Sequence, residues 1–223
     1  MNKNCFVSWS GGKDSCLALF KAKEMGYSPI KLFTMFGMEE ISSSHRLHEK
    51  IIKAQADSLR IEYLIGKSAF DEYEKVFVSN LKSFKEQGIN YGIFGDIDLD
   101  EHRQWEERAC SSAGMEAVLP LWKRDRKEIV KEFITLGFKA KIIVVNTNMI
   151  SKRFLGQDLS LSLIDEIEKA GADPCGENGE YHTVVYDGPI FNKPVDIKYN
   201  YEIIPVGETW AQINAYKDIC NYC

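Results

Sequence analysis

Long apolar runs are missing from this sequence of 223 residues, and none approaches the length that a membrane-spanning helix needs. The apolar stretch at residues 5–7, near the N-terminus, is too short to be the core of a signal peptide. We therefore expect no membrane partner and a cytoplasmic location.

A surplus of positive charge is also missing, because 28 lysines and arginines face 33 acidic residues and leave a net charge of −5. Without a broad basic surface, the chain does not fit a protein that grips long nucleic acid. One basic cluster, residues 123–127, is an exception. It could bind an anion locally, but the start of a solvated helix explains it more simply.

Cysteines are few and scattered, and they are Cys5, Cys16, Cys110, Cys175, Cys220 and Cys223. In a reducing compartment they are expected to be small buried residues rather than a disulfide framework. Only Cys220 and Cys223 have metal or redox spacing, and there is no second pair to complete a zinc site. His45 and His48 are one turn apart but have no neighbouring ligand pattern, so we assign them no metal.

The apolar residues recur with periods that predict alternating strands and helices. Strands are expected at residues 5–9, 30–36, 62–65 and 91–95, and helices at 16–25, 47–59 and 73–84. This alternation predicts an α/β fold with a Rossmann-like parallel sheet and helices on both faces.

The pattern changes in the second half of the chain. We expect a helix after residue 100, a helix that begins at Asp125 with Glu128 as capping partner, a helix at 160–170, and strands at 116–119, 140–146, 181–186 and 195–206. From this we predict an ATP-binding domain at residues 1–121 and a smaller C-terminal α+β, substrate-binding subdomain at 122–223.

A glycine-containing loop follows the first predicted strand, and it reads Ser10, Gly11, Gly12, Lys13, Asp14 and Ser15. Adjacent glycines let backbone N–H groups approach a polyphosphate, and the helix that follows points its positive end at the same place. Lys13 adds a charge, whereas Asp14 fits beside a polyanion only if it caps the helix or helps to hold Mg²⁺. The spacing matches neither the Walker loop nor the dinucleotide fingerprint. We predict that this phosphate loop binds ATP.

Polar residues gather again where the fourth predicted strand ends. Ligands of parallel sheets bind at the carboxyl ends of strands, so Gly95 and Asp96 are expected beside the phosphate loop. We assign Gly95 and Phe33 to the nucleotide site, and Asp96 with Asp14 to Mg²⁺. Asp100 is interpreted as a helix cap. His102 and Arg103 either touch substrate or form an exposed helix face, and Trp105 and Glu106 follow on the next turn.

A second polar loop covers residues 174–183 and holds two glycines, two acids and a histidine. Glu177, Glu180 and His182 could bind an amine, a metal or a proton in transit. An ordinary polar β-loop explains the same composition equally well.

These three groups together resemble the diphthine–ammonia ligase family of the adenine nucleotide α-hydrolase-like superfamily. The similar stretches are residues 10–15, 95–103, 120–126, 175–183 and 187–191. The likeness spans nearly the whole chain, and the Cys-Gly-Glu-x-Gly-Glu run at 175–180 is its specific element.

The resemblance implies a reaction in which a substrate carboxylate attacks the α-phosphate of ATP, pyrophosphate leaves, and ammonia then displaces AMP to form an amide. Gly11, Gly12 and Ser15 would then cradle pyrophosphate. Lys13 would stabilise its charge, and Asp14 or Asp96 would place Mg²⁺. The family likeness also implies that Glu177, Glu180 and His182 bind the acyl substrate or receive a proton from the incoming ammonium.

The chain departs from the family pattern at two positions. Eukaryotic and archaeal members have Gly where this chain has Asn178 and Glu where it has His182, and the 95–105 run is similar to a bacterial branch. Since bacteria lack diphthamide, the carboxylate substrate is left open and is either a small molecule or borne by a protein. The oligomeric state is open too, with a homodimer as one option.

Two alternatives keep the phosphate loop and change the function. One is a tRNA-thiolating enzyme that adenylates a base, which would normally carry paired catalytic cysteines and a basic face. The other is an adenine-nucleotide sensor without turnover, which has no need of the acids and histidine at 177–182.

Overall fold

The structure, a computed structural model, describes residues 3–38, 42 and 45–217. Its elements in chain order are β1 (Asn4–Ser8), α1 (Lys13–Glu24), β2 (Ser28–Phe36), α2 (Glu49–Leu59), β3 (Glu62–Lys67), the 3-10 turn η1 (Phe70–Glu72), α3 (Tyr73–Glu86), β4 (Tyr91–Ile93), α4 (Asp100–Ser112), β5 (Glu116–Val118), α5 (Arg126–Thr135), β6 (Lys139–Asn146), the 3-10 turn η2 (Lys152–Phe154), α6 (Leu161–Lys169), β7 (Tyr181–Asp187), β8 (Lys198–Val206) and β9 (Trp210–Tyr216).

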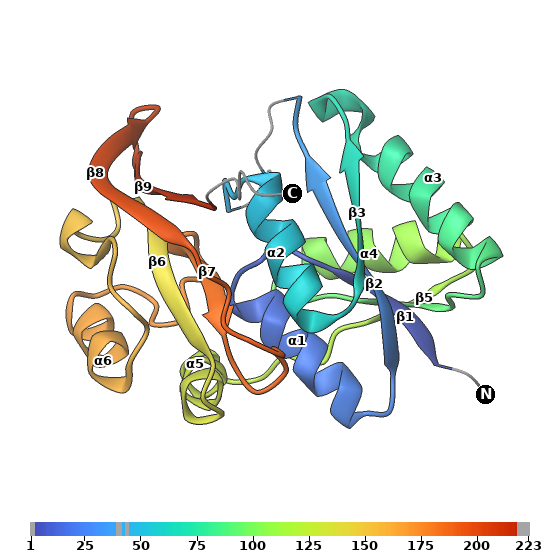
Figure 1. The fold of residues 1–223 in the computed structure, drawn as a ribbon, viewed down its shortest axis with the longest axis horizontal. Coiled ribbons are helices and arrows are strands. Elements are labelled where there is room, and N and C mark those ends of the chain that lie inside the picture. The colour runs from blue at the N-terminus through green and yellow to red at the C-terminus, as the bar shows by residue number, and fades with distance from the viewer. Residues whose placement is uncertain (1–2, 39–41, 43–44, 218–223) are drawn as a thin grey trace, which may run out of the picture.

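The first sheet has five parallel strands in the order β3-β2-β1-β4-β5 (Figure 1). The chain runs outward from β1 through β2 to β3 and then returns to place β4 on the other side of β1. The strand order therefore reverses between β1 and β4, which is where sheets of this kind form a ligand crevice at their carboxyl ends.

Both faces of this sheet are covered by helices. Side chains alternate along the strands, so Phe6 and Phe33 belong to one apolar cluster while their neighbours Val7 and Leu32 belong to another. The Phe6 cluster includes buried residues of α3 and α4, and the Val7 cluster includes buried residues of α1 and α2. The predicted parallel sheet with helices on both faces is confirmed.

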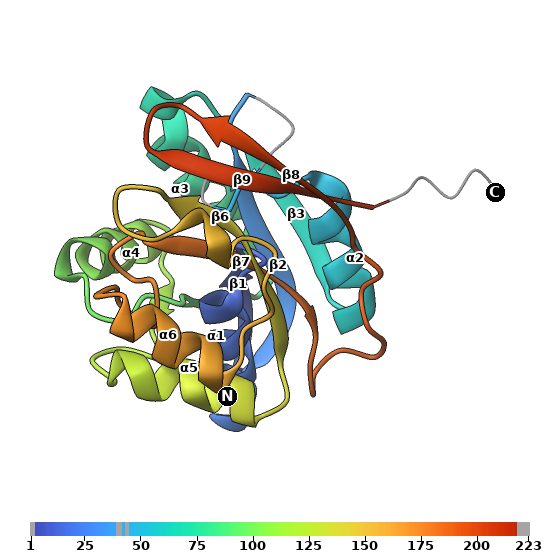
Figure 2. The same cartoon turned by 90° about the vertical axis from the view of Figure 1, so that its left-hand side faces the viewer.

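The second sheet is antiparallel, with the order β7-β6-β9-β8. Helices α1 and α2 lie between the two sheets, as the views in Figures 1 and 2 agree, and α5 and α6 lie beside the second sheet. One continuous core joins the inner helices to this sheet, with Leu17 and Ile52 in the same cluster as Val144 and Ala211. The smaller antiparallel part thus packs directly on the helices that follow β1 and β2.

The structure corrects three details of the expected elements. Strand β9 was not predicted, although Ala211 and Ile213 alternate with polar residues and are buried. Strands β4 and β8 are shorter than the predicted runs at 91–95 and 195–206. Asp100 does not cap α4, because the cap residue is Leu99 and the Asp100 carboxylate lies 3.4 Å from the Lys123 ammonium.

Within the described part of the chain, the cysteines Cys5, Cys16, Cys110 and Cys175 are buried and free of disulfides, as predicted. Cys220 and Cys223 lie outside the described residues. In the described ranges, we find no helix with the length and apolar character needed to span a bilayer.

Candidate active site

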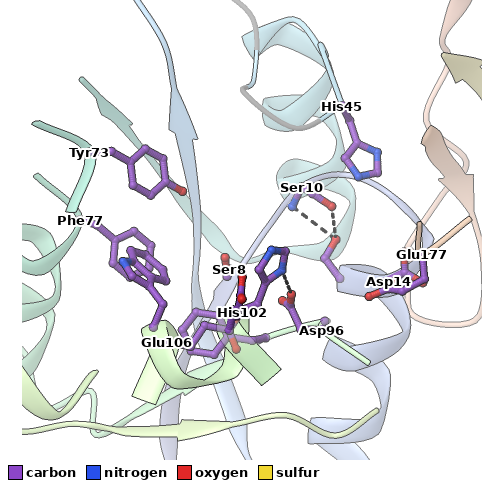
Figure 3. Close-up of a pocket in the computed structure, with 15 residues that line it drawn as sticks. Ser8, Ser10, Asp14, His45, Tyr73, Phe77, Asp96, His102, Glu106 and Glu177 are labelled. Atoms are coloured by element: carbon purple, nitrogen blue, oxygen red, sulfur yellow. Dashed lines mark hydrogen bonds and ion pairs between the residues drawn. The ribbon is translucent and has the colours of Figure 1, made fainter. Parts of the chain in front are cut away.

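A cavity of about 450 Å³ opens at the carboxyl ends of β1 and β4 (Figure 3). Its walls come from the phosphate loop, the turn after β4, helices α3 and α4, and the 174–183 loop. The lining residues are Ser8, Ser10, Asp14, Ser15, His45, Tyr73, Phe77, Phe94, Gly95, Asp96, Glu101, His102, Trp105, Glu106 and Glu177. The structure thus brings together parts of all three groups that the sequence singled out.

The phosphate loop is held in shape by its own serines. The Ser10 and Ser15 hydroxyls are 3.0 Å apart, and the Gly12 amide donates to the Ser10 hydroxyl at 3.3 Å. Gly11 has a φ of +79°, a conformation that costs other residues free energy. Helix α1 begins directly after this loop at Lys13, and the start of a helix carries unpaired N–H groups and the positive end of the helix dipole.

Lys13 and Asp14 form an ion pair at the start of α1. The Lys13 ammonium lies 2.8 Å from an Asp14 carboxylate oxygen and 5.3 Å from the centre of the Tyr181 ring, and Lys13 is only 5% exposed. Burial opposes the charge of Lys13, but the Asp14 carboxylate raises the Lys13 pKa well above its usual value. Asp14 does not cap the helix, since the cap position is Gly12 and no side chain bonds there. The helix-cap role predicted for Asp14 is therefore wrong, and Mg²⁺ binding by Asp14 stays a prediction.

Asp96 lies on the opposite wall with two partners from α4. The His102 ring nitrogen donates to Asp96 at 2.8 Å. Although burial favours its neutral form, hydrogen bonds from His102 and Glu106 hold the pKa of Asp96 below its usual value. The hydrogen bond to Asp96 also raises the pKa of His102. Asp96 is therefore a carboxylate that faces the cavity, as the sequence predicts.

Glu106 also lines the cavity, although its sequence position predicts no role for it. It is 5% exposed, and burial together with its hydrogen bond to Asp96 raises its pKa to about 11. Burial and the neighbouring Asp96 charge therefore favour the protonated form of Glu106 at neutral pH. The available signal was the four-residue spacing of His102 and Glu106, which places both on one face of α4.

The 174–183 loop contributes one of its three predicted residues to the cavity. Glu177 lines it, and burial together with the nearby Asp14 charge raises the Glu177 pKa to about 7. Glu180 is 2% exposed and accepts hydrogen bonds from the Asp173 amide and from both nitrogens of Asn178, each at 3.1 Å. The Glu180 carboxylate therefore organises the loop from behind.

His182 lies deeper than Glu177 and does not line the cavity. Its ring packs between His45, at a centroid distance of 4.8 Å, and Trp210, at 5.4 Å. His45 lines the cavity, and its Nδ1 bonds the Thr183 carbonyl oxygen at 2.8 Å. Because that oxygen only accepts, Nδ1 carries the proton and the other ring nitrogen is free to accept. No sequence pattern had indicated His45.

Lowering the pH from about 6.5 to about 4 is expected to destabilise the fold through these two histidines. Burial lowers the pKa of His45 to about 4 and that of His182 to about 3, against about 6.5 for an exposed histidine. Between pH 6.5 and pH 4 these histidines bind protons in the unfolded chain but not in the folded chain. The free energy of unfolding therefore has its full value above pH 6.5 and falls as the pH drops toward 4. The loss is on the order of 3 kcal/mol per histidine.

Urea denaturation at pH 7.5, 5.5 and 4.5 measures this loss. A His182→Gln variant is expected to lose less stability on acidification than the wild type. His102→Gln, which removes a largely exposed histidine, should not flatten the acid slope. Equal slopes for the wild type and His182→Gln would show that His182 titrates like an exposed side chain.

The two remaining nucleotide assignments lie in different surroundings. Gly95 lines the cavity, whereas the Phe33 side chain is 1% exposed and packs against Phe6, Phe77 and Phe84 in the core. The Phe33 backbone carbonyl accepts a hydrogen bond from the Trp9 amide at 2.8 Å. A Phe33 contribution to the nucleotide site stays a prediction, and the ring itself is a core residue.

A Gly95→Ala substitution is expected to raise the KM for ATP at least about tenfold, since a misplacement of about 1 Å at a reacting site costs this much or more. An added Cβ at Gly95 would lie 2.9 Å from the backbone of Asp14 and Ser15, which cannot rotate away. The start of α1 would shift relative to β4. Gly37→Ala is the matched control, because an added Cβ there meets nothing within 4 Å. Unchanged steady-state kinetics for Gly95→Ala would contradict this packing.

The basic cluster at 123–127 is partly explained by the structure. Asp125 caps α5 by accepting from the Glu128 amide, as predicted. Arg124 pairs with Glu132 at 2.6 Å, and Arg126 pairs with Asp98 and Asp173. These arginines are engaged with carboxylates of the protein itself rather than forming an open anion site.

The parallel sheet, the phosphate loop at its switch point and the cavity beside it define an α/β protein of the nucleotide-binding, PP-loop class. Family models described as the diphthamide synthase N-terminal domain and C-terminal domain match residues 3–117 and 125–223. The chain belongs to the diphthamide synthase family.

Curated relatives named diphthine–ammonia ligase match most of the chain. The Danio rerio protein is 27% identical over 230 residues, which cover 92% of this chain and 90% of that protein. The human protein is 27% identical over 231 residues, which cover 92% of this chain and 86% of that protein. A crystal structure described as a predicted subunit of a tRNA methyltransferase from Methanocaldococcus jannaschii is 19% identical, covers 82% of this chain and 96% of that chain, and has a TM-score of 0.44. That score is too low to bear on fold or function.

Proposed function

We propose that this chain is an ATP-dependent amide ligase that adenylates a substrate carboxylate and transfers ammonia to it. A carboxylate oxygen attacks the α-phosphorus, the bond to the β-phosphate breaks, and pyrophosphate leaves with an acyl-adenylate formed. Ammonia then attacks the acyl carbon, AMP leaves with the bonding electrons, and the nitrogen gives up a proton. The names of the curated relatives support a ligase that uses ammonia.

The observation that carries this proposal is the meeting of Glu177 with the phosphate loop in one cavity. A side chain whose pKa is about 7 can accept a proton at physiological pH and release it afterwards. Among the described residues, no hydrogen bond or ion pair engages the Glu177 carboxyl, so it is free to act on a ligand. A protein that only sensed ATP would not need such a base beside the phosphates.

The phosphate loop is suited to pyrophosphate as a leaving group. Amides near Gly11, Gly12 and Ser15 would face the β- and γ-phosphates at the positive end of α1. Lys13 compensates the Asp14 charge, so that the loop does not repel a polyanion.

The two carboxylates of the cavity fit Mg²⁺. Asp14 and Asp96 both line it and supply the oxygen ligands that Mg²⁺ prefers. No group of three or more His, Cys, Asp or Glu side chains that could hold a metal occurs in the described ranges, which suits an ion that keeps several waters and takes one or two carboxylates. Bound Mg²⁺ would neutralise phosphate charge.

The two parts of the chain would divide the work. Residues 1–121 would hold ATP, and residues 122–223 would supply the substrate side through the 174–183 loop. The carboxylate substrate, whether a small molecule or a protein side chain, would enter next to Glu177. Cytoplasmic location and a homodimer stay predictions.

The surroundings of Cys175, a cysteine beside the phosphate loop, do not favour the thiolating alternative. Cys175 is buried, with its sulfur 3.9 Å from an Asp14 oxygen, and burial raises the pKa of this thiol. A sulfur carrier needs the thiolate form, which this environment suppresses.

One assay tests the proposed reaction. The protein is incubated with ATP, Mg²⁺, ammonium and a panel of carboxylates, and AMP and pyrophosphate are measured. Ammonium-dependent release of AMP together with an amide product is expected. Release of ADP, or tight ATP binding with no AMP release for any carboxylate, would reject the ligase function.

A further inference from the structure

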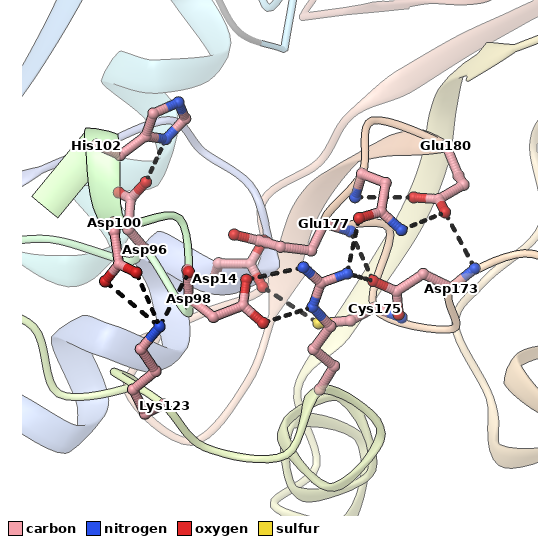
Figure 4. Close-up of polar contacts among 12 residues, drawn as sticks. Asp14, Asp96, Asp98, Asp100, His102, Lys123, Asp173, Cys175, Glu177 and Glu180 are labelled. Atoms are coloured by element: carbon pink, nitrogen blue, oxygen red, sulfur yellow. Dashed lines mark hydrogen bonds and ion pairs between the residues drawn. The ribbon is translucent and has the colours of Figure 1, made fainter.

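Arg126, the first residue of α5, joins two loops that border the cavity, and Figure 4 labels the two carboxylates that it binds, Asp98 and Asp173. Its guanidinium donates to both oxygens of Asp98, each at 2.8 Å. The remaining terminal nitrogen donates to Asp173 at 2.7 Å and to Asn178 at 2.9 Å. One side chain thus binds the loop after β4 and the loop before β7.

On the first side, Arg126 fixes the segment that carries Asp96. Asp98 is two residues beyond Asp96, and the neighbouring turn adds a backbone bond from the Lys123 amide to the Ile97 carbonyl at 2.6 Å. The Lys123 ammonium also reaches the Asp98 carbonyl at 3.3 Å. Arg126 and the turn that precedes α5 therefore hold the 96–98 turn by side-chain and backbone bonds.

On the second side, Arg126 fixes the centre of the loop that carries Glu177. The Asp173 carboxylate, 8% exposed, accepts from the Cys175 amide at 2.8 Å and from the Glu177 amide at 3.2 Å. The Asp173 amide in turn donates to Glu180. The position of the Glu177 backbone is thus set by a carboxylate that Arg126 holds.

The charges around this contact explain why an arginine is needed. Asp98 and Asp173 are both anions, and the same guanidinium binds both. Without that cation the two loops would repel each other across the cavity mouth. Lysine would supply the charge but not the planar fork that reaches two carboxylates at once.

We propose that Arg126 is a positioning residue that holds Glu177 in place against the Asp96 turn and the phosphate loop. Its hydrogen bonds go to Asp98, Asp173 and Asn178, none of which lines the cavity. The catalytic part of this inference rests on the proposed ligase function, whereas the clamp between the loops does not.

The test compares Arg126→Lys with Arg124→Lys, its neighbour in the same basic cluster. Arg124 has similar side-chain exposure, 35% against 27%, but pairs with Glu132, away from both loops. Hydrogen exchange is measured on the amides of residues 173–180, and the two half-reactions are measured as ATP–pyrophosphate exchange and as ammonia-dependent amide formation.

In Arg126→Lys, the loop amides are expected to exchange at least about tenfold faster, because their opening no longer breaks a clamped contact. Amide formation should fall about 10–100-fold, as for a misplaced catalytic group, while the KM for ATP stays within about twofold. Arg124→Lys should match the wild type in all three measurements.

If the amides of residues 173–180 exchange at the wild-type rate in Arg126→Lys, Arg126 does not clamp the two loops, whatever the rate of amide formation. Faster hydrogen exchange of the loop amides with undiminished amide formation overturns the positioning role. A parallel fall of both half-reactions and of the melting temperature also overturns it, because that result indicates a general structural role for Arg126. A wild type that forms no amide rejects the proposed function instead, and the exchange data then decide the clamp alone.

Discussion

Replacing Lys13 by methionine is expected to lower ATP-dependent AMP release about 10²–10³-fold, the loss typical of removing one charge-stabilising donor. Lys13 is 5% exposed and pairs with Asp14 at 2.8 Å. Methionine fills a similar volume but leaves a bare carboxylate at the start of α1, where the phosphates are expected. Both pyrophosphate departure and ATP binding would suffer from this uncompensated charge.

Loss of folding has to be separated from loss of chemistry, because breaking a buried ion pair costs about 3–5 kcal/mol. The double variant Lys13→Met with Asp14→Asn removes both charges and should recover stability without recovering AMP release. Lys23→Met, at an exposed position of the same helix, serves as the matched control. Wild-type rates in the Lys13→Met single variant would exclude the phosphate loop from the mechanism.

Glu177→Gln is expected to reduce ammonia-dependent amide formation about 10²–10⁴-fold while ATP–pyrophosphate exchange continues, the effect of removing a general base from one step only. The pKa of Glu177 is raised to about 7 by burial and by the Asp14 and Asp96 charges, with Lys13 and Arg126 acting in the opposite direction. The basic form is the carboxylate, so the wild-type rate of amide formation should rise as the pH increases through about 7.

Rates of both half-reactions between pH 6 and 8.5 check this expectation, with amide formation compared at a constant concentration of un-ionised ammonia, because that fraction of total ammonium also rises with pH. The rising limb should be absent in Glu177→Gln, whose amide cannot titrate. Glu202→Gln, on exposed strand β8, should keep the wild-type profile. If Glu177→Gln lost both half-reactions equally, Glu177 would be a substrate-binding residue rather than the base.

The sequence was sufficient for the layout of the site but not for its side-chain chemistry. Apolar periodicity located β1 and β4, and the rule for parallel sheets then placed Asp96 beside the phosphate loop. Glu106 and His45 could not be assigned in this way. Their roles depend on burial and on partners distant in the chain, such as the Thr183 carbonyl that fixes the His45 ring.

Glu180 and Arg126 also have roles that the sequence alone did not indicate. Glu180 belongs to a motif rich in acids, yet its carboxylate is used up by the Asp173 and Asn178 nitrogens. Arg126 belongs to a cluster that fits a solvated helix start, yet it binds residues 28 and 47 positions away. Strand β9 is a different case, because its alternating pattern was visible and could have been used.

The position of α1 between the two sheets has a consequence for how this site can change. The Lys13 amide bonds the Thr183 hydroxyl at 3.1 Å, and the Gly11 carbonyl accepts from the Val185 amide at 3.0 Å. Gln55 of α2 bonds the carbonyls of both Gly11 and Val185. Residues 1–121 therefore do not hold the phosphate loop in its conformation by themselves. Strand β7, from the second half of the chain, bonds the phosphate loop directly. A change of substrate that moved β7 would also disturb this loop. We therefore expect sequence changes that alter the substrate to occur in the loops at either end of β7.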